Sequence, residues 1–94
     1  LKETATLVSP GGVKGLTFAD EAATANAAVP SLKAAGADAI VLLIHQGVRT
    51  KGAYNDKSCP GLSGELTPIL DRLDPAISVV ISGHTHAAYV CNYR

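Results

Sequence analysis

The sequence predicts an α/β fold in which short parallel strands alternate with flanking helices. Two continuous apolar runs, at 39–44 and 77–82, have the length and β-branched content of strands that are buried on both faces of a parallel sheet. Stretches with helical periodicity lie before and between these runs, which is the pattern of an α/β layer. Because the chain has 94 residues, we expect one domain or part of one.

The first third of the chain is predicted to contain a strand followed by a helix. A turn at Pro10-Gly11-Gly12 precedes residues 13–18, which we expect to form a short strand. Asp20 is suited to cap the next helix, and Gly36 is suited to end it. An apolar stripe continues in phase through Pro30, which favours a kinked helix over a broken one.

The second half is predicted to hold a loop, a helix and two more strands. The loop runs from His45 to about Pro60, and a helix is expected at 63–73. Pro68 is tolerated only near a helix start, which favours Thr67 as the N-cap. The strand at 77–82 completes a βαβαβ order, and the tail at 87–93 is expected to add one more strand.

Each of the three histidines follows one of the two apolar runs. The carboxyl ends of parallel strands share one edge of a sheet, so neighbouring strands would bring His45, His84 and His86 together there. His84 and His86 are two apart, and on an extended chain they would project to the same side. Because neutral imidazoles bind zinc and similar ions, the pattern indicates a metal site. An ordinary surface or hydrogen-bonded role for each histidine stays open.

Carboxylates that would complete a hydrolytic metal centre are missing from this predicted edge. Only Asp56, in the loop after the first histidine, is placed to approach it. The remaining aspartates lie at the opposite end of a strand or at helix ends, where capping or solvation explains them: Asp20, Asp38, Asp71 and Asp74.

The charge of the chain argues against binding to nucleic acid or to a membrane surface. Lys and Arg number 8, Asp and Glu number 8, and the formal net charge is zero. No apolar run approaches the roughly 20 residues of a membrane span. Basic residues crowd the loop after the first histidine, where solvation and contact with a phosphate are both open: Arg49, Lys51 and Lys57.

The sequence around the histidines resembles the calcineurin-like metallophosphoesterases. Gly83-His84-Thr85-His86 is similar to that family's closing Gly-His-x-His motif, and Leu43-Ile44-His45-Gln46-Gly47 to its preceding single-histidine motif. The resemblance covers essentially the whole chain. More narrowly, the chain resembles bacterial secreted 5′-nucleotidases. The segments that carry this narrower resemblance are residues 1–20 and 36–47, Cys59-Pro60-Gly61-Leu62-Ser63-Gly64 and Tyr89-Val90-Cys91.

The resemblance implies a dinuclear metal site in a metallophosphoesterase α/β sandwich, with residues 1–94 as a single segment of the catalytic domain. His45 and His84 would ligate one divalent ion, such as zinc or manganese, and His86 the other. The family's Asp-x-His, Gly-Asp-x-x-Asp and Gly-Asn-His motifs are absent, as is its substrate domain. We therefore expect the chain to be part of a longer protein and to be inactive alone, with no catalytic residue of its own.

The implied activity is hydrolysis of nucleoside 5′-phosphates, or of another phosphate monoester, by a periplasmic or secreted enzyme. The expected partners are this substrate and the rest of the domain, without nucleic acid or a membrane span. The isolated segment is expected to self-associate or to be marginally stable, because its sheet lacks partners. The residues alone leave two other possibilities open, an autonomous α/β module that holds one metal with three histidines and a scaffold without a site.

The two cysteines, Cys59 and Cys91, are expected to pair in an extracytoplasmic protein, the location that the resemblance implies. Two unpaired, buried thiols are one alternative. A zinc site that uses both thiols with the histidines is another, although the chain has no C-x-x-C spacing.

Overall fold

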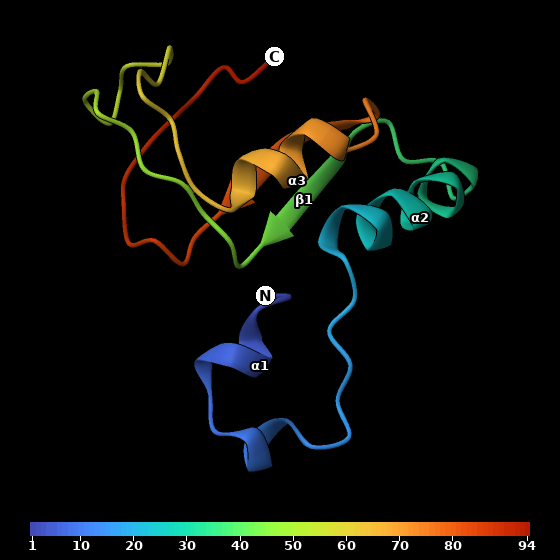
Figure 1. Ribbon diagram of the computed structural model, residues 1–94. Helices are drawn as coiled ribbons and strands as arrows, with labels where there is room; N and C mark the ends of the chain where they lie inside the picture. Colours follow the sequence, from blue (N-terminus) through green and yellow to red (C-terminus); the bar gives the residue numbers. More distant parts are fainter.

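The computed structural model describes all of residues 1–94 and has the α/β architecture that the sequence predicts. The sheet has two parallel strands, and Figure 1 shows helices beside the labelled strand. The elements follow in the order α1 (Thr4–Leu7), the 3₁₀ turn η1 (Pro10–Val13), α2 (Glu21–Ala34), β1 (Ile40–Ile44), α3 (Leu66–Arg72) and β2 (Ile77–Ser82). The observed order therefore has two strands in place of the three in the predicted βαβαβ pattern.

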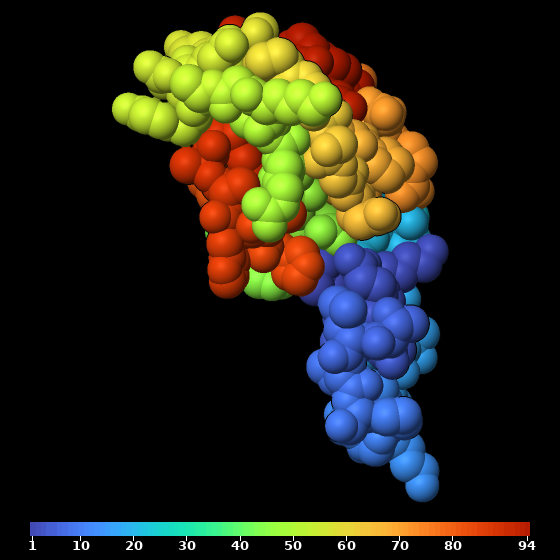
Figure 2. All heavy atoms as spheres, turned by 60° about the vertical axis from the view of Figure 1, so that its left-hand side comes forward, coloured from blue at the N-terminus to red at the C-terminus, as the bar shows by residue number.

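Residues 1–20 form a narrow extension in place of the predicted first strand. Figure 2 shows this segment in blue, projecting from the rest of the molecule. No residue of α1 or η1 is buried, so no neighbouring strand or core is available to hold an extended segment here. Gly15 adopts a φ of 82°, which interrupts the extended backbone that a strand at 13–18 requires.

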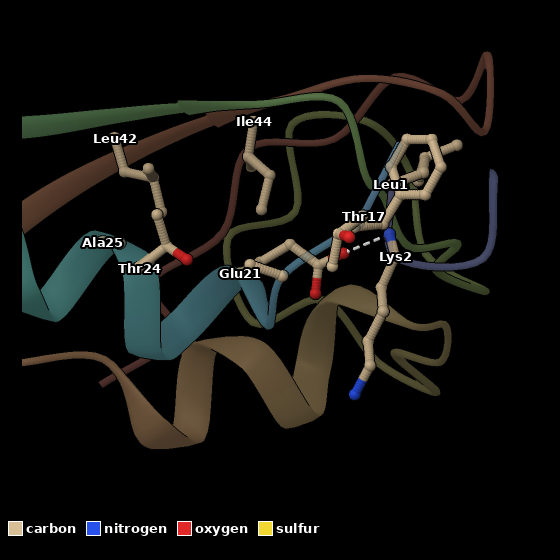
Figure 3. A pocket seen from close by; sticks show the side chains of 10 residues that line it. Leu1, Lys2, Thr17, Glu21, Thr24, Ala25, Leu42 and Ile44 are labelled. Atoms are coloured by element: carbon tan, nitrogen blue, oxygen red, sulfur yellow. Dashed lines mark hydrogen bonds between the residues drawn. The ribbon is translucent and has the colours of Figure 1, made fainter. Parts of the chain in front are cut away.

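The first residues of the chain nevertheless pack back onto α2 and β1. A cavity of about 380 Å³ lies between them, lined mainly by apolar side chains. Leu1 and Ile44 of β1 both line this cavity, and Figure 3 shows the backbone N–H of Lys2 donating to the carboxylate of Glu21 in α2. This contact places the N-terminus beside the end of β1, where the histidine loop begins.

Helix α2 begins and ends as predicted. Asp20 is the N-cap, and its Oδ2 accepts a hydrogen bond of 2.9 Å from the backbone N–H of Ala23. The helix continues unbroken through Pro30, and Gly36 follows it with a φ of 92°. Only Ala22 and Val29 of this helix are buried, so most of the predicted apolar stripe has no partner.

The two strands are hydrogen-bonded neighbours, but only one face of their sheet is covered. Leu42 is paired with Val80 and Ile44 with Ser82, and these residues are partly buried on the helical side. On the other face Leu43 is 72% exposed. The prediction of strands buried on both faces is therefore wrong for this chain, because α2 and α3 pack on the same side (Figure 3).

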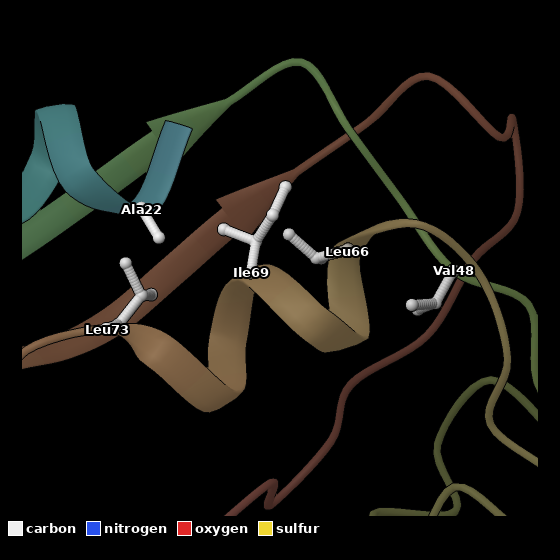
Figure 4. Packing of buried hydrophobic residues seen from close by; sticks show 5 residues of the cluster. All are labelled: Ala22, Val48, Leu66, Ile69 and Leu73. Atoms are coloured by element: carbon white, nitrogen blue, oxygen red, sulfur yellow. The ribbon is translucent and has the colours of Figure 1, made fainter. Parts of the chain in front are cut away.

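The core lies between the covered face of the sheet, α2 and α3. Figure 4 shows side chains from α3 meeting Ala22 of α2 and Val48 of the loop after β1. Helix α3 is shorter than predicted and starts earlier than the expected cap, because Glu65 is the N-cap and Thr67 lies inside the helix. Burial of each large side chain contributes roughly 1.5–3 kcal/mol. Helix α3 supplies Leu66 and Ile69, and its C-cap supplies Leu73.

The tail after β2 is held by the loop between β1 and α3, and the predicted last strand does not form. Backbone hydrogen bonds join Val90 N–H to the carbonyl of Tyr54 at 3.0 Å and Asn92 N–H to that of Lys57 at 2.9 Å. Cys59 and Cys91 form a disulfide, which confirms the pairing and excludes the thiol alternatives. Cross-linking residues 32 positions apart stabilises the fold by about 3–4 kcal/mol in the chain-entropy model.

Candidate metal site

The imidazoles of His45 and His84 meet at the carboxyl ends of β1 and β2. His45 Nε2 lies 3.2 Å from His84 Nδ1, and the ring centroids are 5.0 Å apart with their planes at 69°. The register explains this meeting, because Ile44 at the end of β1 is paired with Ser82 at the end of β2. The predicted convergence at one edge of the sheet is confirmed for these two residues.

His86 does not join this pair in a common cluster. No group of three or more histidine, cysteine, aspartate or glutamate side chains is arranged to hold a metal ion. The expectation that His84 and His86 project together from extended backbone is wrong, because both adopt left-handed conformations with φ of 70° and 54°. His86 is exposed to solvent, whereas His84 is partly buried.

The segments that carry the two histidines are in direct backbone contact. Gly83 N–H donates to the carbonyl of Gln46 at 3.2 Å, and Thr85 Oγ1 donates to the carbonyl of Val48 at 2.8 Å. Between them, a Cβ on Gly47 would lie 2.2 Å from the carbonyl oxygen of Gly83. Only glycine at position 47 therefore permits the close approach of the two segments that carry the histidines.

Gln46 and Glu3 form a polar link beside the histidine pair. Gln46 is 2% exposed, and its Nε2 donates to Glu3 Oε1 at 2.7 Å while its Oε1 accepts from Gly47 N–H at 3.0 Å. The hydrogen bond from Gln46 is the main cause that lowers the pKa of Glu3. Sequence reasoning missed Glu3, because no pattern relates two residues 43 positions apart.

The other charged residues that the sequence offers as candidates for the site lie elsewhere or face solvent. Asp56 Oδ1 accepts hydrogen bonds from the backbone and hydroxyl of Ser58, which lower the pKa of this carboxyl and hold it within its own turn. The molecule has one salt bridge, between Arg72 and Asp20, away from the histidines. The basic residues of the loop are all exposed: Arg49, Lys51 and Lys57.

The nitrogen atoms of the pair fit two ligands of one metal ion. Two nitrogens bound to tetrahedral zinc at about 2.05 Å are about 3.3 Å from one another, and the pair has a separation of 3.2 Å. The same separation also allows a direct hydrogen bond, in which one neutral imidazole donates to the other. Two imidazoles leave a tetrahedral ion incomplete, so a metal held here needs further ligands.

Comparisons with known proteins reveal similarity to a small part of a nuclease. Over 80 residues, which is 85% of the chain, the sequence is 31% identical to Endonuclease YhcR of Bacillus subtilis (strain 168). The chain spans only 6% of the length of that protein. No family model matches the sequence and no solved structure matches it. None of the helices has the length and apolar character needed to cross a membrane.

Proposed function

We propose that this chain contributes part of the metal site of a metal-dependent phosphoesterase that acts on nucleotides. The observation that carries the proposal is the 3.2 Å separation between His45 Nε2 and His84 Nδ1 at the carboxyl ends of adjacent parallel strands. The motif resemblance and the similarity to part of an endonuclease point to the same hydrolytic chemistry.

The proposed roles divide the histidines between two divalent ions. His45 and His84 hold one ion, and His86 is available to the second, in keeping with its separation from the pair. Bound divalent ions polarise a phosphate and supply a nucleophilic water or hydroxide at neutral pH. The remaining ligands are proposed to come from other parts of a catalytic domain, so the chain alone binds metal weakly and does not turn over substrate.

Nucleoside 5′-phosphates are the proposed substrates, in a periplasmic or secreted enzyme. The Cys59–Cys91 disulfide supports an oxidising compartment. Cleavage of a phosphodiester is a second candidate, which is favoured by the similarity to part of an endonuclease. The zero net charge of this segment gives it no overall positive charge with which to bind a nucleic acid backbone.

A titration of the chain with Zn²⁺, followed through the imidazole NMR signals, tests the metal proposal. The signals of His45 and His84 should shift together, and replacing either with alanine should abolish the shift of the other. His86→Ala is the matched control, because this residue lies outside the pair and its loss should leave the joint shift intact. Independent titration of His45 and His84, or no response to Zn²⁺ or Mn²⁺, would overturn the proposal.

Assays on a catalytic domain that contains this segment separate the two candidate activities. Adenosine 5′-monophosphate reports monoester hydrolysis, and a single-stranded oligonucleotide reports diester cleavage. His84→Ala should lower kcat by at least about 100-fold on the true substrate, because loss of a ligand should cost more than loss of a residue that only orients one. Turnover of the oligonucleotide without turnover of the monophosphate would replace the nucleotidase proposal with the nuclease one.

A further inference from the structure

The hydroxyl group of Tyr89 connects the two segments that carry the paired histidines. It lies 2.6 Å from the hydroxyl of Ser82, the last residue of β2, and it accepts a hydrogen bond of 3.4 Å from the backbone N–H of Val48. Ser82 precedes His84 by two positions, and Val48 follows His45 by three. One side-chain oxygen therefore contacts both sides of the junction at which the imidazoles meet.

The tail fixes the position of Tyr89. The next residue, Val90, is hydrogen-bonded through its N–H to the carbonyl of Tyr54 at 3.0 Å, and Cys91 is joined to Cys59 by the disulfide. The ring of Tyr89 is partly buried and packs against the hydrophobic core. Because backbone, disulfide and ring contacts all restrain this residue, its hydroxyl has little freedom to leave Ser82 and Val48.

We propose that Tyr89 is a positioning residue, whose hydroxyl sets the separation of the His45 and His84 imidazoles by joining the end of β2 to the segment after β1. The expected effect of Tyr89 on metal binding rests on the proposed function. Its expected effect on the distance between the two imidazoles does not depend on that function. Loss of the hydroxyl leaves Ser82 Oγ and Val48 N–H without this partner, so the two segments are then restrained here only by the Gly83–Gln46 and Thr85–Val48 hydrogen bonds. Tyr89 takes no part in a chemical step, because its polar contacts reach Ser82 and Val48 and not the imidazoles.

Tyr89→Phe and Tyr93→Phe form a matched pair for the test. Both remove one hydroxyl from the same tail, but Tyr93 Oη donates to Asp71 Oδ1 of α3 at 2.7 Å, away from the histidines. Tyr89→Phe should weaken Zn²⁺ affinity by about tenfold, the lower end of the range for residues that orient ligands. Tyr93→Phe should leave the affinity unchanged within about twofold, even if its thermal stability falls.

Ser82→Ala provides a second variant that removes the same contact from the other side. Combined with Tyr89→Phe in a double-mutant cycle, it should add little to the loss of Zn²⁺ affinity, because both variants break one bridge. Fully additive losses, or a Tyr89→Phe affinity within about twofold of the wild type, would overturn a positioning role.

Proximity of the two imidazole rings gives a readout that needs no metal. Nuclear Overhauser contacts between ring protons of His45 and His84 are expected in the wild type and in Tyr93→Phe, whose hydrogen bond lies elsewhere, and should be lost in Tyr89→Phe. Retention of these contacts in Tyr89→Phe, or their absence from the wild type, would refute the inference. A wild type that shows the contacts but binds no Zn²⁺ would refute the proposed function and leave the positioning role supported.

Discussion

The buried side-chain amide of Gln46 donates a hydrogen bond of 2.7 Å to the carboxylate of Glu3, and so joins the N-terminal segment to the residue that follows His45. The two residues are 43 positions apart in the chain. The link matters for the site because the side chain of Gln46 also accepts a hydrogen bond from the backbone N–H of Gly47. Gly47 in turn packs closely against Gly83, the residue after β2. The N-terminal extension therefore supports the histidine loop from outside the sheet.

Glu3→Ala should lower the free energy of unfolding by about 1–3 kcal/mol, because it leaves the buried amide of Gln46 without its acceptor. Urea denaturation monitored by circular dichroism measures the change. Glu3→Gln is the matched control, since its amide oxygen can still accept the hydrogen bond, and it should retain most of the stability. Equal stability for Glu3→Ala and the wild type would show that the link does not form in solution.

Gly47→Ala should destabilise the fold and weaken binding of Zn²⁺, because the new methyl group would meet the carbonyl of Gly83 and the hydroxyl of Thr85. Overpacking of this kind costs about 1–3 kcal/mol. Gly83→Ala is the matched control. Gly83 lies on the facing segment, but a Cβ at this position would have nothing within 4 Å. Thermal denaturation of both variants checks the prediction, which fails if the two alanines have the same effect.

The ionised carboxylate of Asp20 should stabilise the fold at neutral pH, and this stabilisation should disappear in acid. The hydrogen bond from Arg72 is the main cause that lowers the pKa of Asp20 to about 2 from its ordinary value of 3.8, and the backbone N–H of Ala23 is the next. Because the folded pKa is depressed, the contribution is fully present above the ordinary value and disappears as the pH falls through about 2.

Asp20→Asn isolates this charge, because asparagine remains a good N-cap for α2. Urea midpoints of the variant and the wild type should differ at about pH 6 and converge at about pH 1.5. A difference that persists unchanged in acid would mean that the cap, and not the ion pair with Arg72, supplies the stability.

The uncovered face of the sheet should make the isolated chain associate with itself. Apolar side chains on this face are half-exposed or more, namely Val41, Leu43, Val79 and Ile81. Leu43→Lys should shift the chain toward monomers, because it places a charge in the middle of the apolar surface. Sedimentation velocity at increasing concentration measures the shift, with Lys14→Gln in the N-terminal extension as a control. A monodisperse wild-type monomer with a high melting temperature would contradict the prediction.

Much of the layer that carries the site could be predicted, because its signals are local. The apolar runs of β1 and β2 and the cap at Asp20 depend on neighbouring residues, and all three were placed correctly to within a residue. The predicted meeting of His45 and His84 depended on the two strands being neighbours, and the strand register shows that they are. These parts of the structure require no information beyond periodicity and the chemistry of helix ends.

The errors occur where structure depends on partners that periodicity cannot reveal. An apolar run such as 39–44 predicts a buried strand, but burial on both faces needs a second layer, and this chain supplies helices to one face only. The tail contains strand-forming residues, yet the disulfide and the contacts to Tyr54 and Lys57 hold it against a loop. At the site, the prediction that His84 and His86 project to the same side assumed an extended backbone. Both residues have left-handed backbone conformations instead.

The left-handed backbone conformation of His84 is unfavourable for folding, but the proposed site needs an imidazole at this position. A φ of 70° is unfavourable for a residue with a Cβ, by roughly 1–2 kcal/mol, whereas glycine adopts it without strain. A glycine at this position would therefore make the loop after β2 easier to fold but would remove one of the two imidazoles. Screening for thermostable variants of this chain would be expected to select against the histidine, and any stabilised sequence should be checked for retained metal affinity.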